Sequence, residues 1–162
     1  MKPVLQALVL AERVYEVVGG QKVIAGTFNG VKLRHCVPEE PVAGAEGKTV
    51  LVGGRIGSPY AYISLTDVGH NTELQLQFVS LGRNVVLFET KLVVQCDNRL
   101  ATVEVIVSLP LLHLPEPGTY AFEVVCEGEV IGSHRVIAKM ADEDNDEDDP
   151  KETSDGSIRM GK

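Results

Sequence analysis

Apolar and polar residues alternate along several short stretches of this chain. Residues 73–79 read ELQLQFV, in which every second residue from Leu74 onward is apolar. Residues 103–109 read VEVIVSL and repeat the pattern with Val, Val, Val and Leu. A period of two predicts β-strands that have one face in the core and the other face toward water.

Turn signals separate the apolar stretches. Gly19-Gly20 and Asn29-Gly30 are two-residue hairpin signals, and Asp97-Asn98 and Glu127-Gly128 mark further turns. No segment has the helical periodicity that parallel βαβ units need. The pattern predicts an all-β, antiparallel β-sandwich of roughly nine strands, with residues 110–118 as a proline-rich loop. The candidate strands are residues 4–15, 22–28, 31–37, 49–52, 59–67, 73–79, 85–95, 100–109, 119–126 and 129–138.

The segment from Glu116 to Phe122, EPGTYAF, is similar to the tyrosine corner of immunoglobulin-like domains. In that motif a glycine lies two residues before a tyrosine, whose hydroxyl bonds back to the backbone. Phe122 stands where antibody domains carry a cysteine, and the chain contains no tryptophan. An antibody-type domain is therefore excluded, and a looser immunoglobulin-like sandwich is expected.

A glycine cluster, GGRIG, follows the apolar run TVLV at residues 49–52. Dinucleotide-binding and phosphate-binding loops need G-x-G-x-x-G or Gly-Lys-Ser/Thr between a strand and a helix. Here the spacing of Gly53, Gly54 and Gly57 differs, and another strand-like run follows. The cluster is predicted to be a turn between two strands.

The formal net charge of −8 is concentrated at the end of the chain, because residues 141–162 hold nine acidic and three basic residues. We expect residues 1–140 to form the sandwich and residues 141–162 to form a disordered acidic tail that is too poor in apolar surface to fold. The body is nearly neutral and has no Lys/Arg stripe, which argues against nucleic-acid binding.

The three cysteines, Cys36, Cys96 and Cys126, form no C-x-x-C pair and are odd in number. This usage favours a reducing compartment over a disulfide framework, and the pattern leaves the reactivity of the thiols open. No apolar run reaches the length of a membrane span, and no signal-peptide cleavage site follows the N-terminal run. A cytoplasmic protein without membrane contact is predicted.

Candidate catalytic chemistry is sparse. The histidines, His35, His70, His113 and His134, have no metal-ligand spacing, so no metal site and no cofactor is predicted. No G-x-S-x-G elbow is present.

Two surfaces are candidates for binding a partner. Tyr60 and Tyr62 lie on one face of a predicted strand, opposite the apolar face, where they form either a recognition patch or ordinary cross-strand packing. At the tip of the tail, Ile158 and Met160 alternate with small or basic residues in GSIRMGK. This tip resembles the cargo-loading peptides that bind encapsulin shells, and the resemblance implies a docking role for it.

The segments AERV at residues 11–14 and GTFN at residues 26–29, with SPYAYISLTD and PGTYAFEVVCEGEVIG later, resemble a bacterial family. The members of this family are uncharacterised and catalogued only as a domain of unknown function. The resemblance covers residues 4–138 and implies a β-sandwich. Because the family has no assigned activity, it implies no catalytic residues.

Two functional hypotheses follow from these patterns. The first is a non-catalytic β-sandwich module that binds a protein partner or associates with itself, with the tail as a solubilising tether or docking peptide. The second is a small-molecule or metal-dependent sensor or enzyme with a site in loops at one end of the sandwich, near Arg55, His70 and His113.

Overall fold

The computed structural model describes residues 2–36 and 51–141, and this part of the chain contains eleven strands. The strands are β1 (Val4–Glu16), β2 (Lys22–Thr27), β3 (Gly30–Cys36), β4 (Leu51–Ile56), β5 (Tyr60–Thr66), β6 (Thr72–Ser80), β7 (Val85–Val94), β8 (Val103–Ser108), β9 (Leu112–Leu114), β10 (Gly118–Cys126) and β11 (Glu129–Met140). Within the described residues, no helix is long and apolar enough to cross a bilayer.

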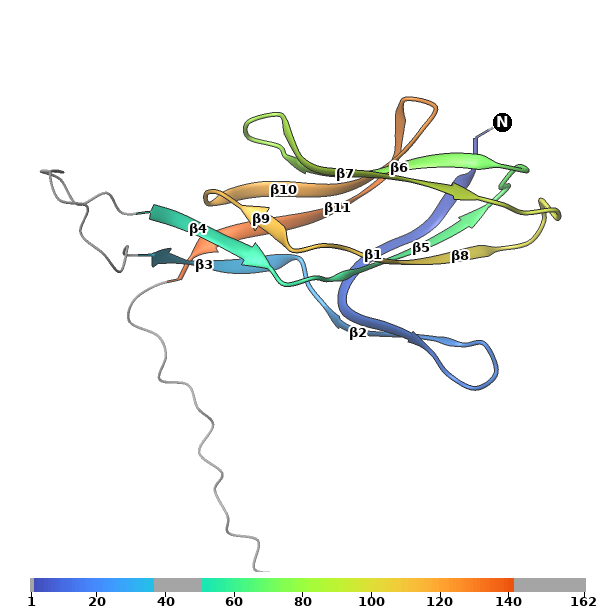
Figure 1. Ribbon diagram of the computed structural model, residues 1–162, viewed down its shortest axis with the longest axis horizontal. Coiled ribbons are helices and arrows are strands. Elements are labelled where there is room, and N and C mark those ends of the chain that lie inside the picture. The colour runs from blue at the N-terminus through green and yellow to red at the C-terminus, as the bar shows by residue number, and fades with distance from the viewer. Residues whose placement is uncertain (1, 37–50, 142–162) are drawn as a thin grey trace, which may run out of the picture.

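The strands form two sheets that lie one above the other (Figure 1). The four-stranded sheet has the order β2-β1-β5-β8, and the seven-stranded sheet has the order β7-β6-β10-β11-β3-β4-β9. The predicted all-β sandwich is confirmed, with a slightly larger number of strands. The predicted acidic tail lies outside the described residues from residue 142 onward.

Two of the predicted hairpin turns are present. Gly19 and Gly20 connect β1 to β2 with φ angles of 101° and 81°, and Glu127 and Gly128 connect β10 to β11 with φ angles of 50° and 78°. In the two-residue β10–β11 turn, two successive positive φ values are typical of type I′, whose twist matches that of the flanking strands. The β1–β2 connection is longer, because the Gly20 N–H donates to the Val17 carbonyl at 3.1 Å and makes Val18 and Gly19 the central residues. These turns fix the registers of the β1–β2 and β10–β11 pairs.

Asn29-Gly30, the third predicted hairpin, is not one. β2 pairs with β1, whereas β3 pairs with β11 and β4 in the other sheet. The short connection between β2 and β3 therefore carries the chain from one sheet to the other. The chain also changes sheet between β4 and β5, β5 and β6, β7 and β8, and β8 and β9, so five connections in the described residues join the two sheets.

One strand pair departs from the antiparallel prediction. β11 and β3 run parallel, with Ile137 opposite Gly30 and Met140 opposite Leu33. A short hairpin enforces an antiparallel arrangement, but these two strands are separated by most of the chain. Their relative direction depends on how β3 enters the seven-stranded sheet after the connection from β2.

Two further predictions at the level of single elements are wrong. Residues 110–118 contain β9, whose Leu112 and Leu114 are buried while His113 points outward. The glycine cluster lies mostly inside β4, and the turn to β5 begins only at Gly57. A Cβ atom on Gly54 would collide with Cδ2 of the fully buried Leu33, so close packing accounts for this glycine.

The core lies between the two sheets. The four-stranded sheet contributes Leu10, Ala61, Ile63 and Leu65, which are all fully buried. The seven-stranded sheet contributes a row of cross-strand neighbours, in which Phe78 lies opposite Phe122 on one side and Phe88 on the other. The predicted alternation in β6 is confirmed, because Leu74, Leu76 and Phe78 are buried. The other members of the core are Leu33, Ile56, Val68, Val94, Leu109, Leu112, Leu114, Tyr120, Val124, Cys126, Val136 and Ala138.

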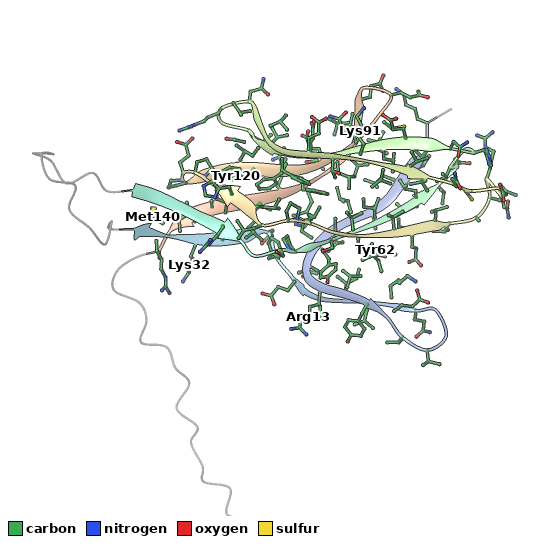
Figure 2. All side chains as sticks on the ribbon, viewed as in Figure 1. Arg13, Lys32, Tyr62, Lys91, Tyr120 and Met140 are labelled. Carbon is green, nitrogen blue, oxygen red and sulfur yellow. The ribbon has the colours of Figure 1, made fainter. Side chains whose placement is uncertain are left out.

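The predicted tyrosine-corner hydrogen bond is present. The Tyr120 hydroxyl donates to the carbonyl oxygen of Glu116 at 2.6 Å, and its ring stacks on Phe78 with centroids 5.6 Å apart. Figure 2 labels Tyr120 in the seven-stranded sheet. Because the ring is buried, this bond holds the approach to β10 against the core.

Replacing Tyr120 with Phe is expected to lower the free energy of unfolding by about 1–2 kcal/mol, because the Glu116 carbonyl loses its donor. Burial raises the pKa of the Tyr120 hydroxyl in the folded chain. Its contribution to stability is therefore fully present below the unfolded-state pKa of about 10 and is lost as the pH rises through the folded-state value. Urea unfolding at neutral and alkaline pH measures both effects.

The variant should show a smaller alkaline loss of stability than the original chain. Tyr15→Phe is the matched control, since the Tyr15 ring is half exposed, and it should change stability by less than about 0.5 kcal/mol. An equal alkaline loss in the original chain and in Tyr120→Phe would contradict the prediction.

Candidate functional site

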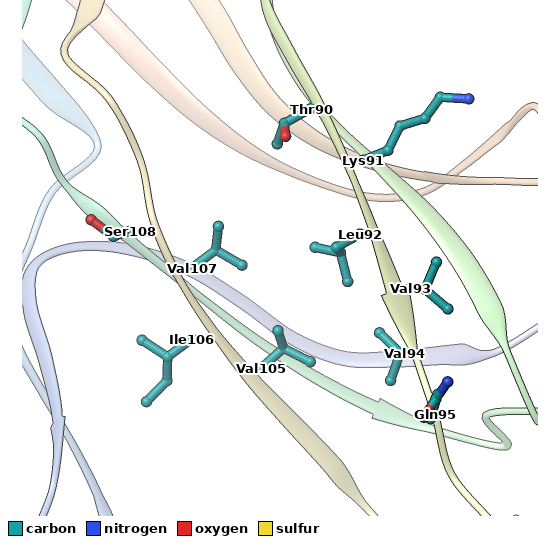
Figure 3. Close-up of a pocket in the computed structure, with 10 residues that line it drawn as sticks. All are labelled: Thr90, Lys91, Leu92, Val93, Val94, Gln95, Val105, Ile106, Val107 and Ser108. Atoms are coloured by element: carbon teal, nitrogen blue, oxygen red, sulfur yellow. The ribbon is translucent and has the colours of Figure 1, made fainter.

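An apolar groove of about 500 Å³ lies between β7 and β8 (Figure 3). β7 is the last strand of the seven-stranded sheet and β8 is the last strand of the four-stranded sheet. The two strands form no ladder with each other in the described part of the chain. The groove is thus the place where the sandwich is open along two neighbouring sheet edges. Its lining residues are Thr90, Lys91, Leu92, Val93, Val94, Gln95, Val105, Ile106, Val107 and Ser108.

Strand alternation decides which side chains enter this β7–β8 groove. Thr90, Leu92 and Val94 lie opposite inward-facing residues of β6, and Figure 3 shows Leu92 pointing toward β8. On β8, Val105 and Val107 lie opposite Ile63 and Ala61 of the core. The inner faces of both strands therefore extend the core to an open edge, where Leu92, Val105 and Val107 are only half-buried.

The edge strand β7 also carries apolar residues on its exposed surface. Val85, Val86 and Val93 are among the most exposed large apolar side chains, and Val93 reaches 59%. Natural proteins usually blunt an edge strand with charge, proline or a bulge, because its unpaired N–H and C=O groups recruit further strands. On β7, Glu89 and Lys91 are the only charged residues.

The predicted tyrosine face is where the alternation placed it. Tyr60 and Tyr62 are half-buried on the outer face of the four-stranded sheet, while Ala61 and Ile63 are fully buried. Tyr62 lies between Val9 and Ile106, and its hydroxyl donates to the Glu104 carboxylate. This hydrogen bond and partial burial raise the pKa of Tyr62. Tyr62 is thus engaged in cross-strand packing, and partner binding by Tyr60 and Tyr62 stays a prediction.

Ile158 and Met160, the other two predicted partner-binding residues, lie outside the described residues. Their docking role therefore also stays a prediction.

A second hollow, of about 560 Å³, lies where the β5–β6 loop meets the β10–β11 turn. His70, Glu73, Lys91 and Cys126 are among its lining residues, and Lys91 forms an ion pair with Glu73 at 3.0 Å. Burial raises the pKa of the Cys126 thiol, which keeps it protonated and weakly nucleophilic at neutral pH. No group of three or more His, Cys, Asp and Glu residues that could hold a metal ion occurs among the described residues.

Only two of the three residues suggested for a loop site lie together. Arg55 on β4 lies opposite His113 on β9, so both belong to strands rather than loops. His70 lies in the β5–β6 loop, toward the other end of the molecule (Figure 1), where its Nδ1 is 3.2 Å from the Asp97 carboxylate. The structure therefore corrects the expectation of a single loop cluster.

The other histidines and cysteines with described side chains have local partners. His134 Nε2 lies 2.8 Å from the carbonyl oxygen of Phe28, and Cys96 Sγ donates to the carbonyl of Asn98 at 3.0 Å. The side chains of His35 and Cys36 lie outside the described part.

Sequence reasoning predicted the strands of β7 and β8 and the shared face of Val103, Val105 and Val107. It missed that the two strands end different sheets and leave a groove between them. The signal available was the apolar run on both sides of Glu89-Thr90-Lys91 in VVLFETKLVV, which places apolar residues on both faces of the strand and exceeds what a strand with one wet face needs.

A scan against protein-family models finds no match, and a search of curated proteins finds no matching protein. The two resemblances noted in the sequence, to the uncharacterised bacterial family and to cargo-loading peptides, stay predictions.

Proposed function

We propose that this protein is a non-catalytic binding or assembly module, and that the β7–β8 groove accepts an added β-strand. The observation that carries the proposal is that two sheet edges, unpaired within residues 2–36 and 51–141, border one apolar groove. An extended chain lying along β7 gains backbone hydrogen bonds from the edge. Every second side chain of the added strand enters the groove. Backbone hydrogen bonds to an edge strand, together with pockets for alternate side chains, are typical of β-strand addition.

The proposal includes a bacterial origin, a cytoplasmic location and an immunoglobulin-like arrangement of the sandwich. It also includes a role for residues 141–162 as a tether or docking peptide. A partner protein and a second copy of this chain are the two kinds of occupant that the proposal includes.

A synthetic peptide with the sequence of β6, TELQLQFVS, is a suitable probe, since β6 already pairs with β7 in an antiparallel register. A fluorescently labelled copy should bind the full chain saturably in an anisotropy titration. The same peptide with proline in place of its second leucine should not bind, because proline removes a hydrogen-bond donor and disfavours a central strand. Saturable binding of both peptides, or of neither, would argue against strand addition.

The groove itself is tested with two substitutions on one strand. Val107→Ala removes two methyl groups from the groove and should weaken peptide binding about tenfold. Ile106→Ala is the matched control: Ile106 is one of the lining residues, but its side chain lies opposite Tyr62 on the outer face and points away from β7 (Figure 3). Equal effects of the two substitutions would place the peptide elsewhere on the molecule.

The hollow lined by His70 supports a second candidate function, a small-molecule or metal-dependent sensor or enzyme. It is favoured by the mixture of an imidazole, a thiol and an ion pair around one space. A thermal-shift screen with divalent metals and common metabolites distinguishes it, since a ligand of this site should raise Tm and lose that effect in His70→Ala.

A further inference from the structure

β7 is the longest of the free sheet edges in the described structure. It has 10 residues, whereas the other terminal strands, β2, β8 and β9, have 6, 6 and 3. An intermolecular strand pair gains one set of backbone hydrogen bonds for every two residues, so length favours β7. A two-fold symmetric pair must also be compatible with its own sequence read in the opposite direction.

The sequence of β7 meets that condition about Thr90. Residues 87–93 read LFETKLV, so the chemical classes run aliphatic, apolar, acidic, Thr, basic, apolar, aliphatic. In an antiparallel pair centred on Thr90, Glu89 of each copy lies opposite Lys91 of the other. Phe88 lies opposite Leu92, and Leu87 lies opposite Val93. Every position therefore meets a residue of matching chemistry, with two ionic pairs related by the two-fold axis.

The Phe88–Leu92 pairs of this register lie on the core side of β7, and the ionic pairs lie on its exposed side. Phe88, Thr90 and Leu92 lie opposite Phe78, Leu76 and Leu74 of β6, so they face the core side. Glu89 and Lys91 face outward and are exposed. Lys91 also contacts Glu73 at 3.0 Å, and Figure 2 labels its side chain on the surface of the seven-stranded sheet. In the symmetric pair this lysine would lie between Glu73 of its own chain and Glu89 of the second copy.

The β7–β8 groove is the second reason to expect a second copy of the chain beside β7. A strand added beside β7 extends the seven-stranded sheet across the opening, and its core-side residues lie over Val105 and Val107 of β8. With a second copy, those core-side residues are Phe88 and Leu92, which bury apolar surface in an apolar groove.

No other terminal strand of the two described sheets has this symmetry. On β8, VEVIVS, the single charge Glu104 would face Ile106 in a pair centred on Val105, or Ser108 in a pair centred on Ile106. β2 carries Gly26 at φ 70°, which weakens a strand, and β9 is too short.

We propose that the chain forms a two-fold symmetric dimer by antiparallel pairing of β7 with β7 of a second copy, with Thr90 on the axis and Glu89 opposite Lys91. The proposal rests on the function proposed above and names the second copy as the strand that the groove accepts.

Charge reversal tests the register. The full chain should behave as a dimer in light scattering after size exclusion at micromolar concentration. Glu89→Lys places two pairs of like charges across the axis, as does Lys91→Glu, and each should weaken dimerisation about tenfold or more. Glu89→Lys with Lys91→Glu restores opposite charges at both places and should bring the dissociation constant back to within about threefold.

Circular dichroism and Tm confirm that each variant is folded, and Glu127→Lys, a charge reversal in the exposed β10–β11 turn, is the control that should leave the dimer intact. A monomeric original chain overturns the proposal. So does a dimer that the single reversals leave unchanged, or one that the double reversal fails to restore.

Cross-linking tests the position of the axis independently. In an antiparallel pair the two residues on the axis have Cα atoms about 4.5–5.5 Å apart, within the range of a disulfide. Thr90→Cys should therefore yield a covalent dimer under mild oxidation. Val93→Cys, on the same exposed edge, lies opposite Leu87 and should not, and neither should the original chain with its native cysteines. Cross-linking of Val93→Cys but not of Thr90→Cys would overturn this register.

The β6 peptide separates failure of the dimer from failure of the proposed function. If the chain is monomeric but binds the peptide, strand addition stands and the second copy is not the occupant. If the original chain is monomeric and binds no peptide either, the groove does not accept strands and both proposals fail.

Discussion

Replacing Phe78 with Ala should lower the free energy of unfolding by about 3–5 kcal/mol. Phe78 is fully buried, stacks on the Tyr120 ring and lies between Phe122 and Phe88 as their cross-strand neighbour. The substitution removes a large apolar group at the centre of the seven-stranded sheet and leaves a cavity that its strands can only partly close. Urea unfolding followed by circular dichroism measures the change.

The control for Phe78→Ala is Leu100→Ala. Leu100 is 90% exposed in the connection between β7 and β8, so its replacement should change stability by less than about 0.5 kcal/mol. A loss below about 1 kcal/mol for Phe78→Ala would contradict the packing described here, because a residue with that loss cannot be central to the core.

Replacing Gly54 with Ala should cost about 1–3 kcal/mol, the usual penalty for overpacking a core. The new methyl group would overlap Cδ2 of Leu33, which is fully buried and has little room to move. The damage should fall on the pairing of β4 with β3, the strand that carries Leu33. Chemical denaturation of the purified variant checks the value.

The same glycine cluster supplies the matched control. A Cβ atom on Gly57 would have no neighbour within 4 Å, and the backbone there is not in the left-handed region. Gly57→Ala should therefore be neutral or should stabilise the fold by up to about 1 kcal/mol, since alanine restricts the unfolded chain. Equal stability of the two variants would show that Gly54 is not held by packing against Leu33.

The proposed function depends on the same core. Phe78 lies opposite Phe88 in the register of β6 and β7. The inner face of the edge strand β7 is therefore supported by the row of cross-strand neighbours Phe88, Phe78 and Phe122. A second copy added along β7 would continue that row with its own Leu92 opposite Phe88. Assembly and folding would then use one continuous apolar layer, which is common where a sheet extends across a dimer interface.

The sequence by itself determined the local structure of this protein. Alternation along β6 placed Leu74, Leu76 and Phe78 in the core, because side chains of a strand point to opposite faces by turns. Gly19-Gly20 and Glu127-Gly128 identified true hairpins, because these turns are closed by adjacent residues. The bond between Tyr120 and Glu116 was also predictable, since its partners are four residues apart.

Only the tertiary structure decided how the strands are distributed between the sheets. Asn29-Gly30 has the sequence of a hairpin, yet β3 pairs with β11 rather than β2, because burying both sheets against each other outweighs the preference of one turn. The requirement for glycine at position 54 comes from Leu33, which is distant in sequence. The β7–β8 groove likewise depends on which strands end each sheet, and that is fixed by long-range pairing that no local pattern encodes.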